Sequence, residues 1–266
     1  MSFEKKYKNI TKENKSYLCV GLDSELAKIP SFLKTEPEPM LVFNKRIIEE
    51  TYQYVAAYKP NFAFYISEGS KGIDTLRKTI EFIPKNIPVI LDIKAGDIGN
   101  TMEQYAKSVF EYFCADAMTI NILMGTDVIL ACLKGKNAFG FALVLTSNSS
   151  AADFLTQNDL YERLAEKVNM FGHEKLGAVV GATQTEYLSQ IRTMMPDSIF
   201  LVPGIGSQGG ELETVCKNLS ATNEEPLFLI NSSRGIIFAD STKHFAEVAQ
   251  TEAINLKDNI NKYLNR

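Results

Sequence analysis

The sequence has 266 residues, of which 45% are apolar, and its formal net charge is −4. This length and apolar content suffice for one large core, and the slightly acidic balance excludes a broad basic surface for nucleic acid. No segment approaches the roughly 18 consecutive apolar residues of a membrane span, and residues 1–15 lack the apolar stretch of a signal peptide. The four cysteines are widely spaced without a Cys-x-x-Cys motif, which predicts reduced thiols in a cytoplasmic protein and no zinc site.

Short apolar segments alternate with segments of helical periodicity along the chain. In the first half, strands are predicted at 17–23, 55–61, 87–94 and 117–121, followed in turn by helices at 40–54, 70–83, 100–113 and 126–133. In the second half, strands are predicted at 139–145, 176–182, 199–203 and 227–231, with helices at 161–171, 186–194, 211–219 and 242–263.

Eight strand–helix units predict a (β/α)₈ TIM barrel, an α/β fold in which residues 1–266 form a single domain. Strands that are apolar throughout are typical of a parallel sheet covered by helices. The second possibility is an open sheet of Rossmann or flavodoxin type. Gly204-x-Gly206-x-x-Gly209 matches a dinucleotide fingerprint, but a single match near the C-terminus is weak evidence. Residues 1–15 are expected to form a solvated polar arm, or a helix packed outside the barrel.

Charged residues end the third predicted strand abruptly. Asp92 and Lys94 are two residues apart, so their side chains point to the same face of a strand, and Asp97 follows closely. Such groups are costly to desolvate at the end of a buried strand unless they are paired. A strand-end salt bridge followed by a helix cap would explain the stretch structurally, and an active site would explain it functionally.

Other polar residues fall at or just beyond the carboxyl ends of six further strands. They are Asp23, Lys59, Asn61, Asn121, Thr146, Ser147, Gln208 and Arg234. In a barrel these ends meet at one mouth, where the active sites of this fold lie. The loops after strands seven and eight commonly bind phosphate, and here they supply a glycine-rich turn and a guanidinium.

Four charges of alternating sign are expected at this mouth. Lys59, Asp92, Lys94 and Asp97 would each have oppositely charged neighbours, so all four could stay ionised in a closed pocket. Lys94 is therefore expected to remain protonated and to donate a proton. A Schiff-base role would require its neutral amine, which the carboxylates disfavour. The two histidines are isolated, and neither a Ser-His-Asp triad nor a metal cage is predicted.

The stretch Asp92-Ile93-Lys94-Ala95-Gly96-Asp97-Ile98-Gly99-Asn100-Thr101 resembles the Asp-x-Lys-x-x-Asp-Ile signature of the orotidine 5′-phosphate decarboxylase family. Supporting motifs follow the family's order along nearly the whole chain: Lys59 with Asn61, residues 203–210, and Ser233-Arg234-Gly235. Thr146-Ser147-Asn148 and the long connection after Asp23 resemble the larger bacterial and apicomplexan-type branch. The resemblance implies cofactor-free decarboxylation of orotidine 5′-monophosphate to UMP and CO₂ in de novo pyrimidine synthesis, by a homodimer with shared sites.

The resemblance also implies a role for each candidate residue. Lys94 would protonate the C6 carbanion, Asp92 would orient Lys94 beside the leaving carboxylate, and Lys59 would bind the ribose. Asp97, Ile98 and Thr101 would be donated to the partner subunit's site. The other substrate contacts would come from Asp23 and Asn61 at the ribose, Thr146 and Ser147 (or Ser149) at the pyrimidine, Gln208 and Arg234 at the phosphate, and Asn121, Pro203 and Ser233.

Two alternatives stay open. A 3-keto-gulonate-6-phosphate decarboxylase or hexulose-phosphate synthase would resemble this family but depend on a metal. Such an enzyme would be expected to carry an acidic ligand on strand two, where this chain has Lys59 and Asn61. A nucleotide-binding barrel without activity is the other alternative, and the complete set of four charged residues argues against it.

Overall fold

The computed structural model of the chain describes residues 1–205, 209–220 and 225–265. Eight parallel strands form its central sheet. They are β1 (Leu18–Leu22), β2 (Ala57–Pro60), β3 (Ile90–Ala95), β4 (Ala117–Ile120), β5 (Gly140–Leu145), β6 (Leu176–Val180), β7 (Phe200–Pro203) and β8 (Phe228–Ser232). The predicted α/β barrel is therefore confirmed, and each predicted strand overlaps one of these eight.

The sheet curves into a barrel whose strands follow the order β2-β1-β8-β7-β6-β5-β4-β3. The two end strands approach each other through isolated parallel bridges, Tyr58 with Val89 and Asn61 with Asp92. This second bridge brings the polar end of β2 beside the charged end of β3. Since all strands run in parallel, their carboxyl ends lie at one mouth.

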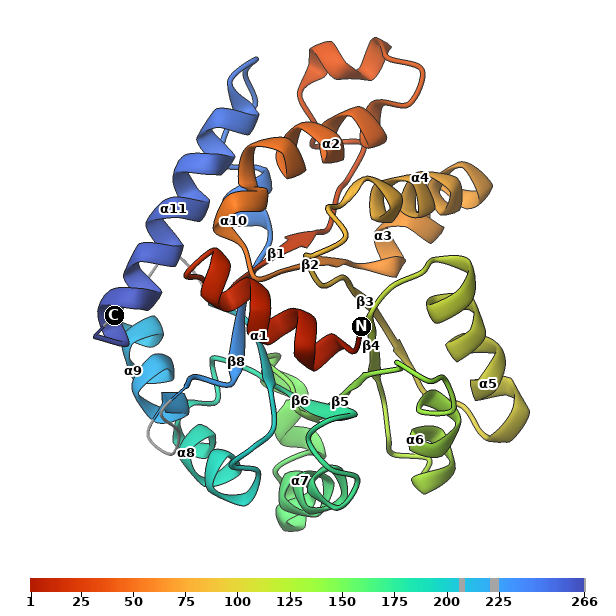
Figure 1. Cartoon of the computed structure of the whole chain (residues 1–266), viewed down its shortest axis with the longest axis vertical. Helices are drawn as coiled ribbons and strands as arrows, with labels where there is room; N and C mark the ends of the chain where they lie inside the picture. The colour runs from red at the N-terminus through yellow and green to blue at the C-terminus, as the bar shows by residue number, and fades with distance from the viewer. Residues whose placement is uncertain (206–208, 221–224, 266) are drawn as a thin grey trace.

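Helices surround the sheet, as Figure 1 shows in a view along the barrel. The longer ones are α2 (Pro39–Thr51), α4 (Gly69–Phe82), α5 (Gly99–Lys107), α6 (Thr126–Cys132), α7 (Leu160–Met170), α8 (Thr185–Met194), α9 (Gly209–Ser220) and α11 (Phe245–Tyr263). Two short helices, α3 (Phe62–Ile66) and α10 (Arg234–Ile237), follow β2 and β8 and were not predicted. The helix predicted at 100–113 continues beyond α5 as a π-helical turn, Ser108–Tyr112. In the part of the chain that the structure describes, no helix is long and apolar enough to cross a membrane.

The N-terminal residues, expected to form a polar arm or an outlying helix, form α1 (Phe3–Glu13) across the end of the barrel where the strands begin (Figure 1). Its apolar face is buried, and the Phe3 ring stacks on that of Phe139 with centroids 4.6 Å apart. The Tyr7 hydroxyl donates to the Pro226 carbonyl at 2.9 Å and accepts from the Phe228 N–H at 3.1 Å. Thus α1 closes the barrel opposite the mouth.

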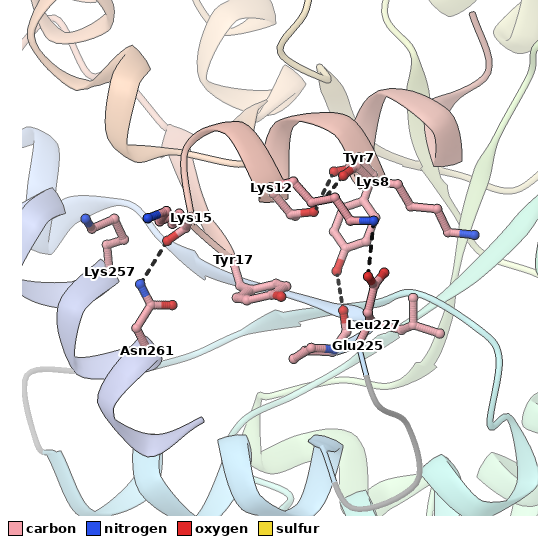
Figure 2. Close-up of a pocket in the computed structure, with 11 residues that line it drawn as sticks. Tyr7, Lys8, Lys12, Lys15, Tyr17, Glu225, Leu227, Lys257 and Asn261 are labelled. Carbon is pink, nitrogen blue, oxygen red and sulfur yellow. Dashed lines mark hydrogen bonds and ion pairs between the residues drawn. The ribbon is translucent and has the colours of Figure 1, made fainter. Parts of the chain in front are cut away.

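A pocket of about 370 Å³ lies beside α1 at this closed end, and Figure 2 shows the side chains around it. Lys12 on α1 forms an ion pair with Glu225 at 3.1 Å, and the side-chain amide of Asn261 on α11 donates to the Lys15 carbonyl at 2.8 Å. These contacts join the N-terminal region to the segment before β8 and to α11. The polar residues predicted at the strand ends, where the structure describes them, lie at the other end of the barrel.

Candidate active site

The end of β3 departs from regular strand geometry. Register between β3 and β4 shifts between Leu91 and Ala95. Within the shifted segment, Lys94 has φ of +49°, a left-handed conformation that is uncommon outside glycine and costs free energy. The irregularity turns the backbone just before Gly96, where the side chains of Asp92 and Lys94 contact each other.

Asp92 lies at the centre of this cluster. Its Oδ2 accepts a hydrogen bond from Lys59 Nζ at 2.7 Å, and its Oδ1 accepts one from Lys94 Nζ at 2.6 Å. The side chains of Lys59 and Asp92 are 5% and 9% exposed, whereas that of Lys94 is 49% exposed. Lys59 and Asp92 are therefore a buried pair, and the Lys94 side chain extends from them into open space at the mouth.

Burial and charge pairing shift the pKa values of Asp92 and Lys59 in opposite directions. Burial disfavours the ionised carboxylate of Asp92, but the ammonium groups of Lys59 and Lys94 outweigh it, so the pKa of Asp92 lies well below its usual range. Burial likewise disfavours the ammonium of Lys59, yet Asp92 and then Asp23 outweigh it, and the pKa of Lys59 is raised. Lys59 and Asp92 are thus both ionised near neutral pH.

Two adjoining cavities open over the cluster, and Lys59, Asp92, Ser147 and Pro203 line both of them. The larger cavity has a volume of about 650 Å³, and its other predicted lining residues are Asp23, Asn61, Ser233 and Arg234. The smaller has a volume of about 290 Å³ and is lined by Lys94 and Thr146, together with the apolar side chains of Leu143, Val179 and Leu201. The structure therefore brings ten of the predicted residues together at one mouth.

Four predicted residues of the described chain do not line these cavities. Asp97 is half-buried in the loop after β3, where its Oδ1 accepts from the Ile98 N–H at 2.8 Å, and the Ile98 and Thr101 side chains are exposed. Asn121 follows β4 and its Oδ1 accepts from the Leu123 N–H at 3.1 Å. Gln208 lies outside the described residues.

Close backbone packing holds the loop after β5 against the mouth. The Thr183 hydroxyl donates to the Ser147 carbonyl at 2.8 Å, and the Gln184 side chain donates to the Thr146 carbonyl at 3.1 Å. A Cβ on Gly181 would lie 2.5 Å from the Ser147 Cα, so this approach requires glycine. Ser147 is thereby held at the boundary between the two cavities.

Two residues of the site were not predicted. Thr119, 1% exposed in β4, donates to Asp92 Oδ1 at 2.9 Å. Asn231, 8% exposed in β8, lines the larger cavity, and its buried Oδ1 has no hydrogen-bond partner. Each is a polar residue within an apolar strand, and Thr119 shares the strand face of Asn121, so the rule that selected strand-end residues could have found them.

The donors at the mouth suit an anion better than a metal. In the described ranges, no three histidine, cysteine, aspartate or glutamate side chains lie close enough to hold a metal ion. The carboxylate of Asp92 is already neutralised by two ammonium groups. Arg234, at the start of α10, is exposed and lines the larger cavity, where its guanidinium could bind a phosphate.

Known proteins are similar to this chain in both sequence and architecture. The sequence pattern of the Orotidine 5'-phosphate decarboxylase / HUMPS family matches residues 16–248. An orotidine 5'-phosphate decarboxylase of Christiangramia forsetii is 45% identical over 91% of each chain, and one of Bacteroides fragilis is 42% identical over 99% of this chain and 98% of its own. The solved structure of Leishmania donovani OMP decarboxylase aligns over 100% of both chains, with a TM-score of 0.84 and 34% identity. This chain therefore belongs to the orotidine 5'-phosphate decarboxylase / HUMPS family.

Proposed function

We propose that the protein decarboxylates orotidine 5′-monophosphate to UMP and CO₂ without a cofactor, in de novo pyrimidine synthesis. The observation that carries this proposal is the cluster of Lys59, Asp92 and Lys94, in which a buried carboxylate joins two ammonium groups below the cavities. The family and the relatives of similar length support the same reaction.

The two cavities suit the two parts of such a substrate. Apolar walls from β5, β6 and β7 make the smaller cavity suitable for a flat pyrimidine ring, whose polar edge Thr146 and Ser147 would bind. Asp23 and Asn61 would bind the ribose hydroxyls in the larger cavity, with Lys59 completing this contact. Pro203, Ser233 and Asn231 would form its walls, and Arg234 would bind the phosphate, together with Gln208 from the glycine-rich loop.

Lys94 would perform the proton transfer. Loss of CO₂ leaves the bonding electron pair on C6 of the pyrimidine, and an ammonium already in place stabilises this developing negative charge. Lys94 would then deliver a proton to C6 to form UMP. Asp92, which accepts from Lys94 Nζ at 2.6 Å, would orient the ammonium and repel the substrate carboxylate until CO₂ departs.

We also propose that the protein acts as a homodimer, with Asp97, Ile98 and Thr101 completing the partner subunit's site. Large apolar side chains are exposed on the elements that follow β2, β3 and β4, neighbouring strands of the barrel; they are Ile66, Ile98, Tyr105, Leu123 and Met124. Large apolar side chains exposed on neighbouring elements are typical of a protein–protein interface. This interface would place the half-buried Asp97 beside a second copy of the chain.

The four free thiols suit a cytoplasmic enzyme.

The decisive experiment adds orotidine 5′-monophosphate to the protein in the presence of EDTA and follows the ultraviolet absorbance. Loss of the substrate absorbance is expected with the wild type, and a matched Lys94→Ala variant should be inactive. Unchanged absorbance with folded wild-type protein would refute the proposal. Activity that disappears with EDTA and returns with a divalent metal would favour the metal-dependent sugar-phosphate branch.

A further inference from the structure

The Thr119 hydroxyl is linked to both the backbone and the ammonium of Lys94. It contacts the backbone directly, and it reaches the ammonium through Asp92. It accepts a hydrogen bond from the Lys94 backbone N–H at 2.8 Å. It also donates to Asp92 Oδ1 at 2.9 Å, and this oxygen is the one that accepts from Lys94 Nζ at 2.6 Å. One buried hydroxyl therefore connects the backbone of Lys94 with the carboxylate that holds its ammonium.

The position of Lys94 needs such support. Its φ of +49° lies where the β3–β4 register shifts, so its N–H cannot follow the regular ladder. The Thr119 hydroxyl supplies a partner for this N–H in place of a backbone carbonyl. A left-handed lysine persists only where its surroundings favour that conformation.

We propose that Thr119 is a positioning residue for the proton donor, an inference that rests on the proposed decarboxylase function. Thr119 lines the smaller cavity, but its side chain is 1% exposed and its single hydroxyl proton is directed to Asp92, so the hydroxyl acts on substrate through Lys94 and Asp92. The hydroxyl holds the lysine backbone in the left-handed conformation and holds Asp92 Oδ1 toward the ammonium. The distance from Lys94 Nζ to the pyrimidine C6 then depends on Thr119.

The methyl and the hydroxyl of Thr119 can be separated by substitution. Thr119→Val removes the hydroxyl and keeps the shape, whereas Thr119→Ser keeps the hydroxyl. We expect kcat of the valine variant to fall by about tenfold to a hundredfold, as displacement of a reacting group does, with KM within about twofold of the wild type. The serine variant should retain kcat within about threefold, because both hydrogen bonds can form.

A matched control is Thr79→Val. Thr79 lies in α4 and is also fully buried, and its hydroxyl accepts from the Asn44 side chain at 2.9 Å. This control should lose stability and keep kcat. If Thr119→Val does not fold, Thr119→Ala and Thr119→Ser are compared, since both lose the methyl and only serine keeps the hydroxyl. A kcat about tenfold lower in the alanine variant than in the serine variant supports the positioning of Lys94 by the hydroxyl.

Each outcome decides the matter. If the wild type is active, an unchanged kcat in Thr119→Val overturns the proposed role of the hydroxyl and leaves the proposed function standing. Equal kcat in the alanine and serine variants has the same meaning. A rise in KM without a fall in kcat also overturns it, because the effect would then lie in substrate binding. Wild-type protein without decarboxylase activity overturns the proposed function, and this inference with it.

Discussion

Replacing Asp92 by asparagine removes the carboxylate at the centre of the buried cluster. The substitution leaves the Lys59 ammonium, whose side chain is 5% exposed, without the carboxylate 2.7 Å away. Removing one partner of a buried ion pair typically costs about 3–5 kcal/mol, because the remaining charge is uncompensated. For a chain of this size that loss corresponds to a fall in Tm of roughly 6–20 °C. Activity should also be lost, because Lys94 loses the group that orients its ammonium.

The sign of the pH dependence provides a sharper test. In the wild type, the lowered pKa of Asp92 contributes stability that is present above about pH 3.9 and lost as pH falls through its folded-state pKa. The raised pKa of Lys59 contributes stability that is present below about pH 10.4 and lost as pH rises through its folded-state pKa. In Asp92→Asn, burial acts on Lys59 without its nearest carboxylate, so its pKa should fall below the ordinary value. Stability of the variant should then rise with pH on approach to 10.4.

Denaturant unfolding at equal protein concentration, from pH 5 to pH 10, measures both effects. The matched control is Glu81→Gln, which neutralises a carboxylate in the exposed ion pair with Arg77 on α4 and should cost less than about 1 kcal/mol. A loss in Asp92→Asn no larger than in this control would refute the reasoning. So would a free energy of unfolding that varies with pH in the same way in the variant and in the wild type.

Three further predictions concern the shared site, the substrate contact and the closed end of the barrel. Mixing inactive Asp97→Ala and Lys94→Ala chains should restore up to about one quarter of wild-type activity, since random mixing gives half heterodimers with one whole site each; no recovery in verified heterodimers contradicts sharing. Asn231→Ala should raise KM roughly fivefold to tenfold in steady-state kinetics, because its amide would lose a hydrogen bond with substrate, and an unchanged KM contradicts this contact. Tyr7→Phe should lower the free energy of unfolding by about 1–3 kcal/mol with unchanged kcat, because the buried N–H of Phe228 loses its hydroxyl partner; equal denaturation midpoints would count against it.

The sequence alone determined the repeating strand–helix order and much of the mouth. Apolar runs bounded by polar residues identified all eight strands, since burial on both faces requires continuous apolar sequence. The two-residue spacing of Asp92 and Lys94 placed them on one face. Parallel strands bring their carboxyl ends together, and this rule alone associated Lys59, Arg234 and Ser147 with them.

Only the tertiary structure decided which atoms meet. Lys59 and Asp92 are 33 residues apart, and their contact depends on the approach of β2 to β3. The left-handed backbone of Lys94 and its hydrogen bond with Thr119 follow from the register shift between two strands, which no local pattern reveals. Local periodicity reports which face of an element is buried, whereas hydrogen bonds between distant residues depend on register and closure, and these are properties of the whole barrel.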